Sequence, residues 1–184
     1  MAYNTSTDTY TDYSTQLHEQ LGWDYVTAIA TLPDGRLTLG GVVLDAQLNK
    51  TPKMATFEPA AIKFTDISAG LGLTNIIKTI EIGQKNGVVT TYLGMYNEDK
   101  KTYKIAAYTA GPTPTPVLVR IKTLEGCTNL DEMFIKDGKD LFVTRRNRDG
   151  AKVEEYKNAN IAGYTYVDLT NAFNAALRWP SVTA

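Results

Sequence analysis

Three passages of this 184-residue chain repeat the same order of residue types, and this repeat limits what the chain can fold into. Each passage begins with a glycine and a strand-like segment, reaches an Asp-Gly or Asn-Gly turn, and enters a second strand-like segment. They cover residues 22–39, 72–91 and 126–144. The turn glycines Gly35, Gly87 and Gly138 lie 52 and 51 residues apart. The spacing predicts three units of one design, over residues 23–71, 72–124 and 125–170.

Each unit has room for four strands, and alternation of apolar and polar residues marks them. Tyr103, Ile105 and Ala107, for example, alternate with polar neighbours, which is typical of a half-buried strand. The expected strands are 25–32, 36–44, 53–58 and 61–67; 76–82, 88–96, 102–109 and 117–121; and 130–135, 140–146, 153–157 and 164–169. After them, Leu169, Phe173 and Leu177 have helical spacing, so a short helix is expected over 168–179, ended by Pro180.

Units of about 50 residues with four strands resemble the blades of β-propeller proteins, in length closest to the kelch type. The resemblance covers residues 23–170 and depends on strand order and turn spacing. The double glycine of kelch blades occurs once, at Gly40-Gly41, whereas the other units have Tyr92-Leu93 and Arg145-Arg146 there. The resemblance implies a mainly antiparallel all-β fold of propeller-blade-like repeats. A single β-sandwich or barrel is the alternative, because its hairpins also recur with turn signals.

Two further segments flank or interrupt the units. Residues 1–22 form an arm rich in Ser, Thr and Tyr, ahead of a single β-rich domain at 23–184. Tyr10 and Thr11 favour strands, so we expect the arm to add to a sheet edge or to a neighbouring subunit. Pro112, Pro114 and Pro116 predict a stiff exposed connector inside the second unit.

Composition excludes several classes of function. The net charge of −1 gives no general affinity for nucleic acid. No apolar stretch approaches the length of a membrane span, and residues 1–6 lack the features of a secretory signal, so a virion or a cytoplasm is the expected location. Cys127 and His18 are the only residues of their types, so a thiol or histidine metal cluster cannot form. No cofactor is expected.

The chain shows no pattern typical of catalysis. Gly70-Leu71-Gly72 begins like a dinucleotide loop, but Asn75 stands where the third glycine should be. Asp131-Glu132 and Glu154-Glu155 are adjacent on strands, so the two carboxylates of each pair point to opposite faces. Residues 147–150 resemble a calcium loop that lacks its first acidic ligand, and a plain turn is favoured. We therefore expect no enzyme activity.

The expected contact residues are basic and aromatic. Arg145, Arg146 and Arg148, near Lys152, are the densest basic cluster, although alternation on a strand separates Arg145 from Arg146. Trp23 and Trp179 flank the repeats. The full set of interface candidates is Tyr10, Tyr13, Trp23, Arg145, Arg146, Arg148 and Trp179.

These features predict a non-enzymatic structural subunit of a symmetric assembly, such as a virion or phage tail. Propellers typically need four to eight blades to close, so three blades leave open ends that invite copies of the chain or other structural proteins. Two chains would supply six blades. The alternative is a carbohydrate-binding, lectin-like propeller. It would need a recurring aromatic position, where this chain has Trp23, Leu73 and Cys127.

Overall fold

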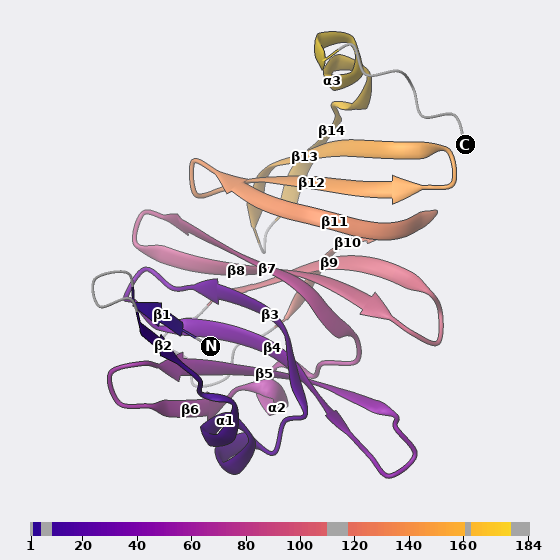
Figure 1. Cartoon of the computed structure of the whole chain (residues 1–184). Helices are drawn as coiled ribbons and strands as arrows, with labels where there is room; N and C mark the ends of the chain where they lie inside the picture. The colour runs from indigo at the N-terminus through magenta and orange to yellow at the C-terminus, as the bar shows by residue number, and fades with distance from the viewer. Residues whose placement is uncertain (1, 5–8, 110–117, 161–162, 178–184) are drawn as a thin grey trace.

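The computed structural model describes residues 2–4, 9–109, 118–160 and 163–177. Twelve of the strands in these ranges form three four-stranded antiparallel sheets, each made of strands consecutive in the chain. The expected all-β fold with three blade-like units is confirmed, and none of the three sheets closes into a barrel. Figure 1 shows them stacked in chain order.

Each sheet is a meander in which every strand pairs with the next one along the chain. The first sheet contains β3 (Tyr25–Thr31), β4 (Leu37–Leu44), β5 (Lys50–Glu58) and β6 (Lys63–Asp66). The second contains β7 (Ile76–Lys85), β8 (Val88–Asn97), β9 (Thr102–Thr109) and β10 (Val119–Leu124). The third contains β11 (Cys127–Lys136), β12 (Asp140–Asn147), β13 (Gly150–Asn160) and β14 (Gly163–Asp168).

The strand β5 begins earlier than expected, at Lys50 rather than residue 53. Pro52, which suggested a loop, lies inside the strand opposite Val42 of β4. The neighbouring strand β6 pairs with β5 only from Ala55 to Glu58. Pro52 is therefore tolerated because it lies where β5 is the edge of its sheet.

The apolar core lies between the sheets, and the second sheet is buried on both faces. Tyr92 of β8 packs with residues of the third sheet, whereas the adjacent Leu93 packs with Met54 of the first sheet. On β9, Ile105 likewise packs with residues of the third sheet, and the adjacent Ala106 packs with Met54 of the first sheet. This division follows from the alternation of side chains along a strand.

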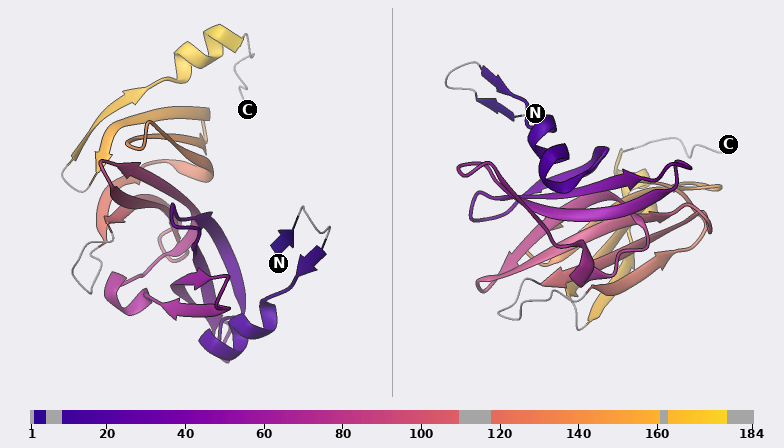
Figure 2. Two further views of the ribbon diagram at one scale, coloured as in Figure 1. Left: turned by 90° about the vertical axis from the view of Figure 1, so that its left-hand side faces the viewer. Right: turned by 90° about the horizontal axis from the view of Figure 1, so that it is seen from below.

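The sheets contact one another chiefly through their first strands. β7 lies against β3 on one side and β11 on the other. The innermost strands of propeller blades have a comparable arrangement around a central axis. The three sheets follow a curved stack, and the N-terminal hairpin projects from the end where the first sheet lies (Figure 2).

Within this chain the N-terminal arm does not add to the edge of a blade, and its addition to a neighbouring subunit stays a prediction. Its strands β1 (Ala2–Asn4) and β2 (Thr9–Thr11) pair with each other as a separate two-stranded sheet, not with an edge of a blade. A helix that the sequence did not indicate, α1 (Ser14–Leu21), connects β2 to the first sheet, and α2 (Ser68–Leu71) connects the first and second sheets. The expected C-terminal helix is α3 (Thr170–Leu177).

Two expectations fall on parts of the chain outside the described residues: the proline connector at 112–116 and Trp179. In the described ranges, the protein has no helix with the length and apolar character needed to cross a bilayer.

Candidate interaction surfaces

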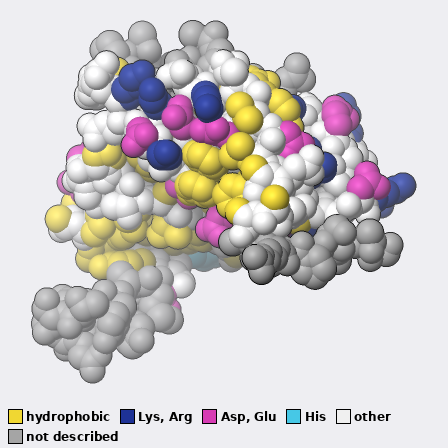
Figure 3. Space-filling model, turned by 90° about the horizontal axis from the view of Figure 1, so that it is seen from above, with side chains coloured by type: hydrophobic (Ala, Val, Ile, Leu, Met, Phe, Trp, Pro, Cys, Tyr) yellow, Lys and Arg dark blue, Asp and Glu magenta, His cyan; other side chains and the backbone are white. Residues whose placement is uncertain are grey.

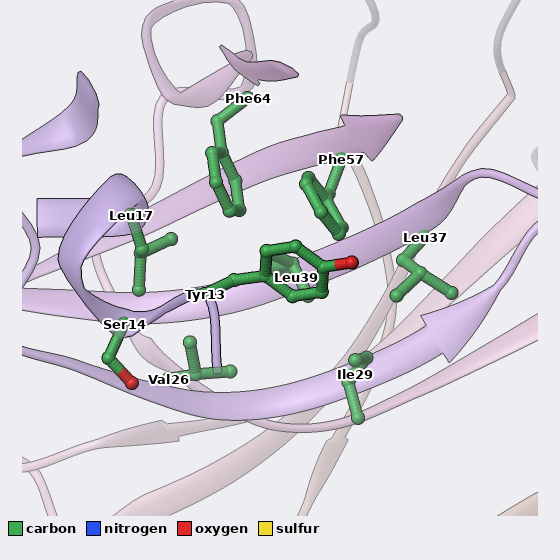
Figure 4. Close-up of a pocket in the computed structure, with 9 residues that line it drawn as sticks. All are labelled: Tyr13, Ser14, Leu17, Val26, Ile29, Leu37, Leu39, Phe57 and Phe64. Atoms are coloured by element: carbon green, nitrogen blue, oxygen red, sulfur yellow. The ribbon is translucent and has the colours of Figure 1, made fainter. Parts of the chain in front are cut away.

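The face of the first sheet that points away from the second sheet is apolar and hollowed. A pocket of about 270 Å³ lies between this face and the start of α1 (Figure 4). It is lined by Tyr13, Ser14, Leu17, Val26, Ile29, Leu37, Leu39, Phe57 and Phe64. We call the six members on strands, Val26, Ile29, Leu37, Leu39, Phe57 and Phe64, the first outer face.

The side of this face near β3 is uncovered. Ile29 is 58% exposed and Val26 is 42% exposed, although both are aliphatic. On the opposite face of the same strand, Ala28 and Ala30 pack against the second sheet. Near β5, by contrast, the ring of Tyr13, which directly precedes α1, lies 5.0 Å from the ring of Phe57, so this side of the face is covered.

The third sheet has a corresponding apolar surface at the other end of the stack. Phe134 of β11 and Phe142 of β12 are cross-strand partners whose rings stack, with centroids 4.7 Å apart. Their neighbours in each strand, such as Met133 and Val143, pack against the second sheet, so both phenylalanines point away from it. Val153 and Val167 share this side of the sheet.

We call Phe134, Phe142, Val153 and Val167 the third outer face. Phe134 is 45% exposed. Viewed from the third-sheet end of the stack, hydrophobic side chains gather in the middle of the surface, with acidic and basic side chains around them (Figure 3). The exposed pair Arg146 and Asp131, 2.8 Å apart, belongs to the same sheet.

The arginines of the basic cluster do not lie on one surface of the third sheet. Arg145 is buried and points toward the second sheet, whereas Arg146 is exposed and Arg148 lies exposed in the turn between β12 and β13. Arg145 donates from Nε and Nη2 to the two carboxylate oxygens of Glu154, at 3.0 and 2.7 Å. Arg145 is therefore part of the interior of the chain and is not available to a partner.

Glu154 is fully buried and is the centre of a polar cluster. Its oxygens also accept hydrogen bonds from the phenols of Tyr156 and Tyr166, at 2.8 and 3.0 Å. Burial by itself would raise the pKa of Glu154, but the hydrogen bonds from Arg145 and the tyrosines outweigh it and hold this pKa below its ordinary value. For Tyr166, burial and the Glu154 charge raise the pKa to about 12.

The aromatic interface candidates have different positions. Tyr13 is half-buried against Phe57. Trp23 is 1% exposed and covers Gly41 closely, since a Cβ built there would lie 2.2 Å from the indole ring. Trp23 therefore belongs to the core of the first sheet and cannot be reached by a partner. Tyr10 lies in β2.

The residues considered for catalysis are not assembled into a site. The His18 ring lies 3.1 Å from the carbonyl oxygen of Trp23, and the Cys127 thiol donates to the Asn129 carbonyl. Burial raises the pKa of Cys127, which favours the unreactive thiol. Within the described ranges, no three His, Cys, Asp or Glu side chains gather as metal ligands. Residues 147–150 form the β12–β13 turn, as expected.

The positions that a repeated sugar site would use show no common surface. Trp23 and Cys127 are buried, and Leu73 packs against the core between the first and second sheets. None of the three therefore offers an exposed aromatic ring for stacking on a sugar.

The outer faces themselves were not anticipated from the sequence. Phe134 and Phe142 could have been found, because each follows a strand residue that belongs in the core and must therefore point to the other side. What could not be read from the sequence is which faces of the sheets remain uncovered.

No protein-family model matches this chain, and no curated protein is significantly similar to it. The class of the protein is therefore defined by its own structure. It is an open array of three blade-like antiparallel sheets whose two end faces carry exposed apolar side chains.

Proposed function

We propose that this chain is a non-enzymatic structural subunit that assembles with copies of itself, and with other structural proteins, into a symmetric complex such as a virion or phage tail. One observation carries the proposal: apolar side chains are exposed at opposite ends of the stack, Val26 and Ile29 on the first outer face and Phe134 on the third. Exposed apolar patches on a folded protein commonly mark contact surfaces.

The internal junctions of the chain support this reading. The first and second sheets, and the second and third, bury apolar side chains between them. The two outer faces have side chains of the same kind without a sheet against them. Joining unlike faces of two copies gives a heterologous contact, which generates a ring if the rotation closes and a filament if it does not. Two chains would give six blades, within the range that closes a propeller.

The test is the native mass of the purified chain, measured by light scattering over a range of concentrations. We expect species larger than one chain, and we expect Phe134→Lys to weaken association by about tenfold or more, as for a residue central to an interface. The matched control is Val88→Lys, because Val88 is 52% exposed but belongs to the second sheet. Circular dichroism checks that both variants fold.

Two results would contradict the proposal. One is a chain that remains monomeric at every concentration. The other is a Val88→Lys variant that loses association as strongly as Phe134→Lys, because that would indicate a nonspecific response to added charge.

A further inference from the structure

The two ends of the chain share a six-residue pattern. Residues 9–14 read Thr-Tyr-Thr-Asp-Tyr-Ser, and residues 165–170 read Thr-Tyr-Val-Asp-Leu-Thr. The first, second and fourth residues are identical, and both segments end in a hydroxyl residue. Residues 64–68, Phe-Thr-Asp-Ile-Ser, follow the same order. In all three places a strand ends at the aspartate or just before it, and a helix begins at the hydroxyl residue. We call Asp, an apolar residue and Ser or Thr the Asp-hydroxyl motif.

Two of the three motifs attach their helix to the third strand of a sheet in the same way. The backbone N–H of Ile67 donates to the carbonyl of Met54 on β5, at 2.9 Å, and that of Leu169 donates to the carbonyl of Val153 on β13, at 2.8 Å. In return, the Met54 N–H donates to the Ser68 hydroxyl at 2.8 Å. The Val153 N–H donates to the Thr170 hydroxyl at 3.1 Å.

The pairing of the preceding strand also agrees. Asp66 lies opposite Ala55, and Asp168 lies opposite Glu154, in each case one residue beyond the strand residue that bonds the motif. Each aspartate accepts the N–H of its hydroxyl residue, at 2.7 Å for Ser68 and 2.9 Å for Thr170. The motif is therefore a docking element with a defined register on a third strand.

The first motif has the internal part of this geometry without the docking. Asp12 accepts the N–H of Ser14 at 2.9 Å, as in the other two motifs. The Ser14 hydroxyl is exposed, however, and donates to Asp12 at 2.6 Å. In the part of the chain that the structure describes, β2 pairs with β1, and Ser14 has no hydrogen bond to the third strand of a blade.

We infer that β2 of one copy takes the place of β14 on β13 of a second copy. Asp12 then lies opposite Glu154, and Tyr13 and Ser14 bond Val153 as Leu169 and Thr170 do. This inference rests on the proposed assembly function and specifies its junction. The second copy is the occupant that the sequence favours, because Thr9–Ser14 matches the very segment that already docks on β13.

The exchange would also repeat, between two copies, the order of strand, helix and sheet that connects neighbouring sheets within one chain. The third sheet of one copy, completed by β2, leads through α1 into the first sheet of the other copy. The first sheet leads through β6 and α2 into the second in the same order. The third outer face of one copy and the first outer face of the other are thereby brought toward each other.

The test uses the full-length chain with Cys127→Ala and one new cysteine in each of two preparations. One carries Thr11→Cys and the other Glu155→Cys, because Val167, the counterpart of Thr11, pairs with Glu155. Partners on adjacent strands lie within the Cα separation that a disulfide requires. The matched control replaces Glu155→Cys by Lys157→Cys. Lys157 has a more exposed side chain, 49% against 12%, but lies out of register.

We expect covalent dimers in the mixture of Thr11→Cys and Glu155→Cys, at least about tenfold more than with Lys157→Cys. We also expect Ser14→Ala to lower association, and Thr15→Ala, at the neighbouring exposed position, to leave it unchanged. Association by light scattering without the in-register dimer overturns the exchange but not the assembly function. It would indicate that the end faces stack without strand transfer, or that β2 adds to the free edge of β14. A chain that does not associate overturns both.

Discussion

The buried pair of Arg145 and Glu154 shows why a run of arginines is not a basic surface. Both ions lie almost out of contact with solvent, with side-chain exposures of 9% and 1%. The cost of removing them from water is offset by the two-pronged contact and by the tyrosine hydroxyls that saturate the carboxylate. The side chain of Arg145 therefore links β12 to β13 and is not part of a basic surface.

Removing one partner of this pair should be strongly destabilising. We expect Glu154→Gln to lower the free energy of unfolding by about 3–5 kcal/mol at pH 7, because it leaves Arg145 charged and buried. Urea denaturation measures the change. In the control, Glu98→Gln, the exposed partner of Lys50 is removed, and the cost should be about 0–1 kcal/mol. Equal costs for the two variants would contradict the buried-pair assignment.

The same cluster predicts how stability depends on pH. The pKa of Glu154 is lowered in the folded state, so its stabilisation is present above the unfolded value of about 4.3 and is lost as the pH falls through the lower folded pKa. For Tyr166 the folded pKa is raised to about 12. Its contribution is present below the unfolded value of about 10 and is lost as the pH rises through 12.

We therefore expect Glu154→Gln to have a shallower loss of stability on acidification than the parent chain. Urea denaturation at a series of pH values between about 2 and 7 measures this slope. Parallel pH profiles would show that other carboxylates dominate acid unfolding.

Gly87 and Gly138 lie at equivalent turns, and replacing each by alanine distinguishes the cost of backbone strain from the cost of steric crowding. Gly87 and Gly138 both have positive φ, 78° and 67°. A Cβ at Gly87 would meet nothing within 4 Å, but at Gly138 it would lie 2.0 Å from the carbonyl oxygen of Gln84 in the second sheet. Gly87→Ala should cost about 1–2 kcal/mol from strain alone. Gly138→Ala should cost more in thermal or urea unfolding, and equal costs would show that the turn moves freely.

Among the secondary-structure elements, the helices that start at the Asp-hydroxyl motifs connect or end the blades. Ser68 is a buried example. Its hydroxyl accepts a hydrogen bond from the N–H of Met54 and donates one to the carbonyl of the same residue. One side chain therefore satisfies two backbone groups of β5. This contact fixes where α2 leaves the first sheet.

Replacing this hydroxyl should cost stability. We expect Ser68→Ala to lower the free energy of unfolding by about 1–3 kcal/mol, because the buried Met54 N–H loses its partner. Ser14→Ala, at the exposed motif, should change the stability of the single chain by less than about 0.5 kcal/mol. Urea denaturation at low protein concentration compares the two. A larger effect at Ser14 would mean that α1 holds the first sheet more firmly than α2 does.

The strands were predictable from the sequence because two local signals agree. Turn glycines and period-two alternation mark the strands around Gly35, Gly87 and Gly138, and the strand β9 has the bounds expected, Thr102–Thr109. The helix α1 was missed because Leu17 is its one buried residue, so its apolar period is weak. The N-terminal hairpin was missed because nothing in a polar arm indicates which strand it pairs with.

The candidate surfaces were less predictable than the strands. Alternation does separate Arg145 from Arg146, as the sequence indicated. It does not show that Glu154 neutralises Arg145, because the pairing of β12 with β13 in three dimensions brings them together. Likewise, Trp23 at the start of a unit suggests an anchor in the core or at an interface, and the glycine at position 41 provides the space that buries its ring in the core.

In the whole molecule, the second sheet is the most protected part, because it packs against a neighbour on each face. We expect its strands β8 and β9 to show the slowest amide hydrogen exchange, since their opening requires both cores to open. In the proposed assembly, protection should also rise at β3 as the protein concentration increases, and it should fall at β14, which β2 of a second copy replaces on β13. Exchange measured by mass spectrometry at two concentrations tests this. Uniform protection across the three sheets would contradict it.

The unequal lengths of α1 and α2 limit the symmetry of the proposed assembly. From the motif aspartate to the glycine that ends the helix, the chain covers eleven residues at Asp12–Gly22 and seven at Asp66–Gly72. The four extra residues are one helical turn, about 6 Å long. In the proposed assembly, junctions between chains would therefore differ from junctions within a chain. If electron-microscopy images of such a particle were averaged as though every sheet were equivalent, the density at each subunit boundary would be blurred. Averaging that treats only whole chains as equivalent would preserve the boundary.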